Sequence, residues 1–167
     1  NQLAEAARNG TAINISRHLV NAPAGDLNPE TYELAVRTLF SDIKGVKISS
    51  IVGDKLLKEN MNLIHAVGVG ANTEPRMIRI SYRPKSTKRP IALVGKGVTF
   101  DTGGLNMKPS AGMRLMKKDM GGSAAVCGAS WNLAGSGSSQ PFDAYLALAE
   151  NSVDRHAYHP GDILTAR

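Results

Sequence analysis

The sequence has a single cysteine, Cys127, which excludes an internal disulfide framework and a zinc site built from cysteines. Small apolar residues surround it in the segment 121–135, so we expect a buried structural thiol rather than a nucleophile. Aromatic residues are also scarce, at 5% of 167 residues, whereas the hydrophobic fraction of 42% is that of an ordinary globular protein. The length and composition therefore favour a single folded domain.

Acidic residues are fewer than basic ones, which leaves a net charge of +6 and a pI near 9.6. A basic chain can bind nucleic acid or an anionic membrane surface. The densest basic runs lie at 83–89 and 114–118, and only Tyr82 lies beside either run to stack on a base. We therefore expect solvated basic loops, and nucleic-acid binding is the weaker alternative.

Long hydrophobic runs are absent, because no apolar stretch approaches the roughly 18 residues that a membrane span needs. Residues 1–10 have neither the apolar core of a signal peptide nor the Arg- and Ser-rich pattern of a transit peptide. The sequence therefore predicts a cytoplasmic protein with no membrane partner.

Helical and strand-like patterns alternate along the chain. They predict helices at 2–21, 29–43, 54–60 and 121–134, and strands at 46–52, 76–83, 90–95 and 142–150. Residues 63–70 read as a glycine-rich segment near the core. The side chains expected to point inward from the second helix are Tyr32, Leu34, Val36, Leu39 and Phe40. This order predicts an α/β fold with a mostly parallel or mixed sheet flanked by helices.

The segment 90–95 is continuously apolar, as in a central strand that is buried on both faces. The glycine-rich stretch 96–120 follows it, and ligands of open α/β sheets bind beyond the carboxyl ends of strands. Asp101 and Asp119 in this stretch are either hard oxygen ligands for a metal ion or turn residues beside glycine. Lys96 is expected to be exposed, paired with a carboxylate, or deprotonated by a metal.

The stretch "VGKGVTFDTGGLNMKPSAGMRLMKKDMGGSAAVCGA" closely resembles the signature of the leucyl aminopeptidase family, the cytosol aminopeptidases of peptidase family M17. The intervals from Lys96 to Asp101, Lys108 and Asp119 fit that pattern without a gap. The flanking segments "NAPAGDLNPE" and "AENSVDRHAYHPGDILTAR" resemble the same family, so the similarity covers essentially the whole chain.

The resemblance implies an active site that hydrolyses peptides with two divalent metal ions, zinc, manganese or magnesium. Lys96, Asp101 and Asp119 would be metal ligands. Lys108 would polarise the scissile carbonyl and stabilise the gem-diolate that forms. Met116 would line the pocket for the N-terminal side chain of a leucine-like substrate. The resemblance also implies a homohexamer.

One motif of the family is missing from this sequence. Family members continue to an Asn-Thr-Asp-Ala-Glu-Gly-Arg motif, which supplies a bridging Asp, a bridging Glu and an Arg that holds bicarbonate as the base. Residues 1–167 thus resemble the N-terminal half of the catalytic domain, without the family's separate N-terminal domain and without the C-terminal half. Asp162 and Glu150 are not expected to replace the missing ligands.

Two readings remain besides nucleic-acid binding. In the first, the chain supplies part of an aminopeptidase site and associates with a companion chain or remainder that carries the Asp-Ala-Glu-Gly-Arg motif. The isolated chain would then be inactive or nearly so. In the second, the chain is an inactive truncated relative that serves as a structural or assembly subunit. The four histidines show no spacing of a ligand set, so we expect satisfied or surface side chains at His18, His65, His156 and His159.

Overall fold

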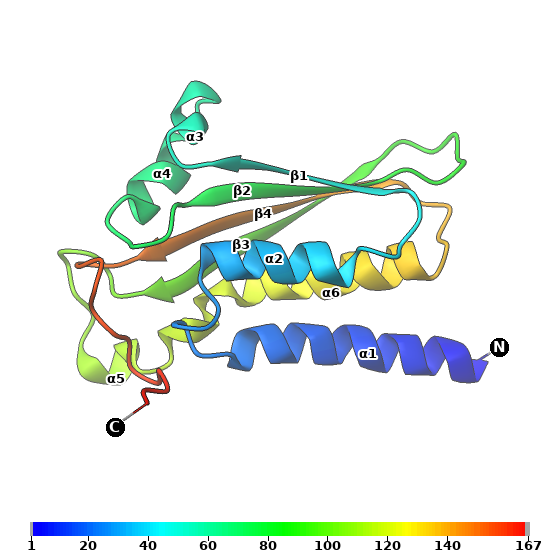
Figure 1. Cartoon of the computed structure of the whole chain (residues 1–167). Helices are drawn as coiled ribbons and strands as arrows, with labels where there is room; N and C mark the ends of the chain where they lie inside the picture. The colour runs from blue at the N-terminus through cyan, green and yellow to red at the C-terminus, as the bar shows by residue number, and fades with distance from the viewer. Residues whose placement is uncertain (1, 166–167) are drawn as a thin grey trace.

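Four strands form one mixed sheet in the computed structural model, which describes residues 2–165 (Figure 1). The strands are β1 (Val46–Val52), β2 (Arg76–Tyr82), β3 (Ile91–Asp101) and β4 (Phe142–Asn151), in the spatial order β1-β2-β4-β3. The β1–β2 and β2–β4 pairs are antiparallel, and the β3–β4 pair is parallel. The predicted α/β class is confirmed, and the sheet is mixed rather than mostly parallel.

Three long helices lie on one side of the sheet: α1 (Gln2–Asn21), α2 (Pro29–Leu39) and α6 (Gly121–Gly135). Figure 1 shows α2 and α6 beneath the strands and α1 farther from the sheet. The shorter elements are α3 (Lys55–Lys58), α4 (Asn62–Gly68), α5 (Ser110–Met113) and the 3₁₀ helix η1 (Met116–Met120). Small residues let α1 and α6 approach closely, since a Cβ on Gly128 would lie 2.6 Å from the Ala12 carbonyl oxygen.

The core lies between the sheet and the helices, and β4 runs through its middle with buried side chains along most of its length. Cys127 belongs to this core and is fully buried, as predicted. Burial raises the pKa of its thiol to about 12, so it is not a thiolate at neutral pH.

Local capping signals set the start of α2 correctly. The Asn28 side chain accepts hydrogen bonds from the backbone N–H groups of Glu30 and Thr31, and the Thr31 hydroxyl accepts one from the Asn28 N–H. The helix ends at Leu39, four residues earlier than predicted. The expectation for Leu34 is wrong, because its side chain is 65% exposed. Leu34 lies two residues from Tyr32, which places it on the opposite face of a helix of 3.6 residues per turn.

Two expectations for the sheet and its surroundings are corrected. Segment 90–95 is not part of a central strand: within residues 2–165, β3 pairs only with β4, and Val94 is 72% exposed. Residues 63–70 are mostly helical, as α4, and Leu63 on this helix is 83% exposed. Only Gly68 of α4 is buried, where a Cβ would lie 2.5 Å from Pro75.

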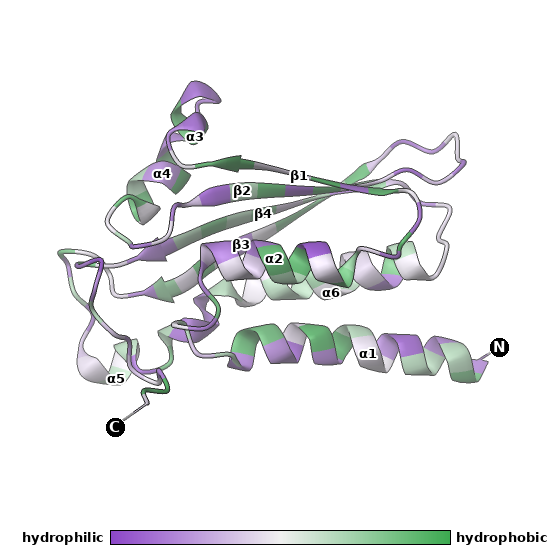
Figure 2. Ribbon diagram, in the orientation of Figure 1, coloured by the Kyte–Doolittle hydropathy of each residue, from purple (hydrophilic) through white to green (hydrophobic). Residues whose placement is uncertain are grey.

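The loop between β2 and β3 has a polar, mostly exposed surface. Figure 2 shows this loop as hydrophilic, and it contains the whole basic run 83–89. Across residues 2–165, no helix combines the length and the apolar character needed to cross a membrane.

Candidate active site

Lys96 lies in the middle of β3 rather than in a loop, so the loop expected from residue 96 begins only after Asp101. The glycines on either side of it serve close packing, not a turn. A Cβ on Gly95 would lie 2.5 Å from Ser123 Cα at the start of α6, and one on Gly97 would lie 2.4 Å from Leu148. Helix α6 therefore presses its first turn against β3 where Lys96 emerges.

Asp119 comes from η1, the short helix that precedes α6, and faces Lys96. The Lys96 ammonium nitrogen lies 2.8 Å from Asp119 Oδ2, with the Lys96 side chain 60% exposed and that of Asp119 22% exposed. Asp119 Oδ2 is itself buried and, among residues 2–165, accepts no hydrogen bond of good geometry, although this ammonium is close. A buried carboxylate oxygen without a hydrogen bond is costly unless a cation completes its surroundings.

Asp101 is the last residue of β3, and Lys108 lies across the following loop from it. The Lys108 Nζ donates to Asp101 Oδ2 at 2.6 Å. Partial burial alone would raise the pKa of Asp101, but hydrogen bonds from Lys108, the Gly103 N–H and Asn151 outweigh burial and lower it. The hydrogen bond to Asp101 raises the pKa of Lys108, and the negative charge of Asp119 adds to that rise.

These interactions bring four of the five residues predicted for the site into one region. Lys96 pairs with Asp119, Lys108 pairs with Asp101, and Asp119 is near enough to act on Lys108. A β-bulge contributes to this arrangement. Between the pairs Val98↔Ala149 and Asp101↔Asn151, β3 advances one residue more than β4. Two successive buried residues, Thr99 and Phe100, mark the break in alternation.

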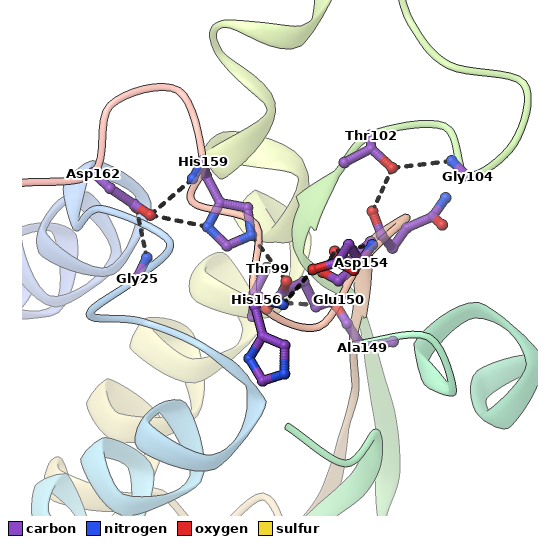
Figure 3. Close-up of polar contacts among 12 residues, drawn as sticks. Gly25, Thr99, Thr102, Gly104, Ala149, Glu150, Asp154, His156, His159 and Asp162 are labelled. Carbon is purple, nitrogen blue, oxygen red and sulfur yellow. Dashed lines mark hydrogen bonds and ion pairs between the residues drawn. The ribbon is translucent and has the colours of Figure 1, made fainter. Parts of the chain in front are cut away.

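The loop after β3 is held tightly to the end of β4. The Thr102 N–H and hydroxyl both donate to the Asn151 carbonyl, at 3.0 and 2.7 Å, and the Gly104 N–H donates to the Thr102 hydroxyl at 3.1 Å (Figure 3). Gly103 and Gly104 have positive φ angles of 90° and 66°, which favour glycine. The Lys108 N–H donates a hydrogen bond to the Thr102 carbonyl. This contact closes the loop and places Lys108 beside Asp101.

Met116, predicted to line a substrate pocket, is the first residue of η1 and is partly exposed, three residues before Asp119. Other apolar side chains on the same stretch are open to solvent, and the exposed ones are Leu105, Met107 and Leu115. An apolar groove of about 520 Å³ lies elsewhere, between α1 and α2, and none of the four site residues lines it.

The side chains of Lys96, Asp101 and Asp119 suit a divalent cation, but they supply few ligands. An amine nitrogen and carboxylate oxygens are competent ligands once the amine has lost its proton, and the buried Asp119 Oδ2 has no hydrogen bond to give up. Among residues 2–165, no group of three or more His, Cys, Asp and Glu side chains could hold a metal ion. The residues present thus fit a metal site that needs further ligands.

A second polar cluster, which the sequence did not reveal, is centred on His159 in the segment after β4 (Figure 3). His159 bridges two carboxylates, with Nδ1 3.0 Å from Asp162 Oδ2 and Nε2 2.9 Å from Glu150 Oε1. Its ring lies 4.7 Å from that of Phe100, the neighbour of Asp101. The satisfied histidine is as expected, and both carboxylates are committed to it. Glu150 lies nine residues before His159 and Asp162 three residues after it, and this spacing matches no motif that would have marked the contacts.

Comparisons with known proteins identify the family of this chain. The model of the cytosol aminopeptidase family, catalytic domain, matches residues 14–167. A probable cytosol aminopeptidase of Corynebacterium diphtheriae is 42% identical over 154 residues, which are 92% of this chain and 31% of that protein. This chain belongs to the cytosol aminopeptidase family.

Solved structures show the same relationship. A leucyl aminopeptidase of Trypanosoma cruzi, in its apo form, superposes with a TM-score of 0.87 at 36% identity, covering 97% of this chain and 32% of that one. The bottromycin maturation enzyme BotP, in complex with Mn, superposes with a TM-score of 0.83 at 38% identity, covering 95% and 34%. The chain therefore spans about a third of the length of the relatives that it matches.

Proposed function

We propose that this chain supplies part of the active site of a metal-dependent aminopeptidase, which releases leucine-like N-terminal residues from peptides. The observation that carries the proposal is the convergence of two lysine–carboxylate pairs, Lys96 with Asp119 and Asp101 with Lys108, along the second half of β3 and before the start of α6. Family membership and the manganese complex of BotP support it.

In this proposal Lys96, Asp101 and Asp119 are ligands of two divalent ions, zinc, manganese or magnesium. The bound ions would supply a nucleophilic water at neutral pH and polarise the scissile carbonyl. Asp119 fits the role because its Oδ2 is buried without a hydrogen bond. Lys96 fits it because β3 and the adjoining glycines fix its backbone against α6.

Lys108 would act on the substrate rather than on the metal. Its ammonium is held by Asp101 and by a loop with two glycines in the left-handed region, so it is preorganised. A fixed positive charge of this kind stabilises the oxyanion that develops when water attacks an amide. Met116 would contact the N-terminal side chain of the substrate, as the resemblance implies.

The remaining ligands would come from outside residues 1–167, which we assign to the N-terminal half of the catalytic domain. The exposed edge of β3 supports a companion segment. In a complete folded protein, a long edge strand with apolar side chains is normally covered by another segment. Here Val94 is 72% exposed and Ile91 43%. The companion would carry the Asp-Ala-Glu-Gly-Arg motif, with its arginine holding bicarbonate as the base, and the complete cytoplasmic enzyme would form a homo-oligomer, a hexamer by resemblance.

The first test is intact mass spectrometry of the purified material under native and denaturing conditions, followed by an assay of leucine-amide hydrolysis with added manganese or zinc. We expect a companion with the missing motif, stoichiometric metal and activity. Asp119→Asn should remove most bound metal and most activity, whereas Asp42→Asn, an exposed carboxylate on the α2–β1 connection, should change neither. Active material with no companion and no metal would refute the proposal. Metal-loaded material without hydrolysis would favour the structural-subunit reading.

A further inference from the structure

Asn151 is the last residue of β4 and lies opposite Asp101 in the parallel β3–β4 pair. Its side-chain amide nitrogen donates to Asp101 Oδ1 at 2.8 Å. The direction of this amide is fixed by chemistry: an ionised carboxylate only accepts hydrogen bonds, so the NH₂ group must face it. The neighbouring strand therefore reaches the Asp101 carboxylate directly.

The other end of the Asn151 amide needs space, which a glycine provides. A Cβ built on Gly104 would lie 3.2 Å from Asn151 Oδ1, so a side chain there would press on the amide. The backbone of Asn151 is equally restrained, because its carbonyl accepts two hydrogen bonds from Thr102. The asparagine is thus held by its main chain while its amide contacts the carboxylate.

The two carboxylate oxygens of Asp101 have different hydrogen-bond partners. Oδ1 accepts from the Gly103 N–H at 3.0 Å and from Asn151 at 2.8 Å. Within residues 2–165, the Lys108 ammonium is the only hydrogen-bond partner of Oδ2. Two donors fixed on one oxygen prevent the carboxylate from rotating about its terminal bond, so the same oxygen always faces Lys108.

We propose that Asn151 is a positioning residue, which fixes the Asp101 carboxylate so that Oδ2 is presented to the metal ions. The inference rests on the proposed function and adds to it a residue outside the ligand set. Asn151 acts through Asp101 and contacts neither ion nor substrate. Groups that orient a ligating carboxylate in this way typically change metal affinity by 10- to 100-fold when they are removed.

The test compares two variants in the complete enzyme that contains this chain. Asn151→Ala removes the amide, and Asn151→Leu removes it while keeping a side chain of similar size. The matched control is Asn132→Ala on α6, whose amide donates at 2.9 Å to Asn9 on α1 and touches none of the site residues. The readouts are the dissociation constant for Mn²⁺, from competition with a chromogenic chelator, and the unfolding midpoint of the metal-free protein.

We expect both Asn151 variants to bind Mn²⁺ about 10- to 100-fold more weakly than the wild type, with metal-free midpoints equal to that of the control. The Mn²⁺ concentration for half-maximal hydrolysis should rise by the same factor, and saturating Mn²⁺ should restore most of kcat. A dissociation constant within twofold of the control overturns the inference, even if activity falls. Metal-free midpoints well below the control also overturn it, because the role is then structural.

The two proposals fail differently. If the wild-type enzyme neither binds Mn²⁺ nor hydrolyses leucine amide, the proposed function fails, and the role of Asn151 falls with it. If the wild type does both and the Asn151 variants match it, only the positioning role is refuted.

Discussion

His159 offers the sharpest test of how the residues after β4 are held. The change is His159→Phe, which preserves a ring beside Phe100 and removes both nitrogen contacts. The two carboxylates left behind, Glu150 and Asp162, have side chains that are each only 9% exposed. Removing one partner of such a buried ion pair lowers stability by about 3 kcal/mol or more, because the other charge stays buried without a partner. Local opening of segment 152–165 should therefore become about 100-fold more frequent, at 1.4 kcal/mol per factor of ten.

The effect should depend on pH in a defined direction. The hydrogen bond to Glu150 raises the pKa of His159 above its usual value, against the opposing effect of burial, and the contact with Asp162 adds to the rise. A raised pKa in the folded state means that the stabilisation is fully present below about pH 6.5 and is lost as the pH rises through the folded pKa. The difference between variant and wild type should be largest near pH 6 and small near pH 9.

The assay is amide hydrogen exchange of residues 152–165, comparing variant with wild type at each pH, so that intrinsic exchange rates cancel. The control is His156→Phe on the same segment, an exposed histidine. The measured quantity is the exchange rate of the variant divided by that of the wild type. If this ratio for His159→Phe stays constant from pH 6 to pH 9, the protonated His159 does not hold Glu150 and Asp162 as argued. A ratio at pH 6 no larger than that of the control would lead to the same conclusion.

Three further outcomes are expected. Asp143→Asn should lower stability by about 1 kcal/mol at neutral pH. Burial opposes ionisation there, but hydrogen bonds from two arginines and a serine lower the Asp143 pKa to about 2, so acid titration should remove this contribution between about pH 4 and pH 2. Gly95→Ala should destabilise the fold by about 1–3 kcal/mol in urea unfolding, since its Cβ would lie 2.5 Å from the Ser123 backbone, whereas Gly10→Ala, with open space around it, should be neutral or stabilising. Lys108→Met should lower kcat of the complete enzyme by about 10²- to 10³-fold, and a decrease of less than tenfold in steady-state kinetics would contradict the proposed role of Lys108 on the oxyanion.

Local signals in the sequence were enough to predict much of the fold. Asn28 followed by Pro29 marked the start of α2, and the capping contacts there are as expected. The run of small residues at 121–134 predicted α6 to within one residue at its end. Such features depend on neighbours within a few positions, so a single sequence contains them.

Features that depend on distant partners could not be predicted in this way. The apolar run 90–95 indicated a central strand, yet β3 is at the edge of the sheet and Val94 is exposed. An apolar pattern indicates that a strand can be buried, but it does not indicate which other element covers that strand. For the site, the resemblance placed Lys96, Asp101, Lys108 and Asp119 together, and the structure brings them into contact as pairs. The contribution of Asn151 was missed because it comes from the next strand in space, 50 residues away in the chain.

The bulge in β3 lies between Val98 and Asp101, and the number of residues in this short segment decides which face of the sheet the Asp101 side chain takes. Side chains alternate along a strand, so residues five apart, such as Lys96 and Asp101, would ordinarily point to opposite faces. The extra residue restores the phase, since Asp101 pairs with Asn151 and Lys96 with Ala147, four residues earlier on β4. Deleting one residue between 98 and 101 would leave a strand able to pair, yet it would send either Lys96 or Asp101, two of the proposed metal ligands, to the opposite face. This segment should therefore tolerate conservative substitutions far better than any change in its count of residues.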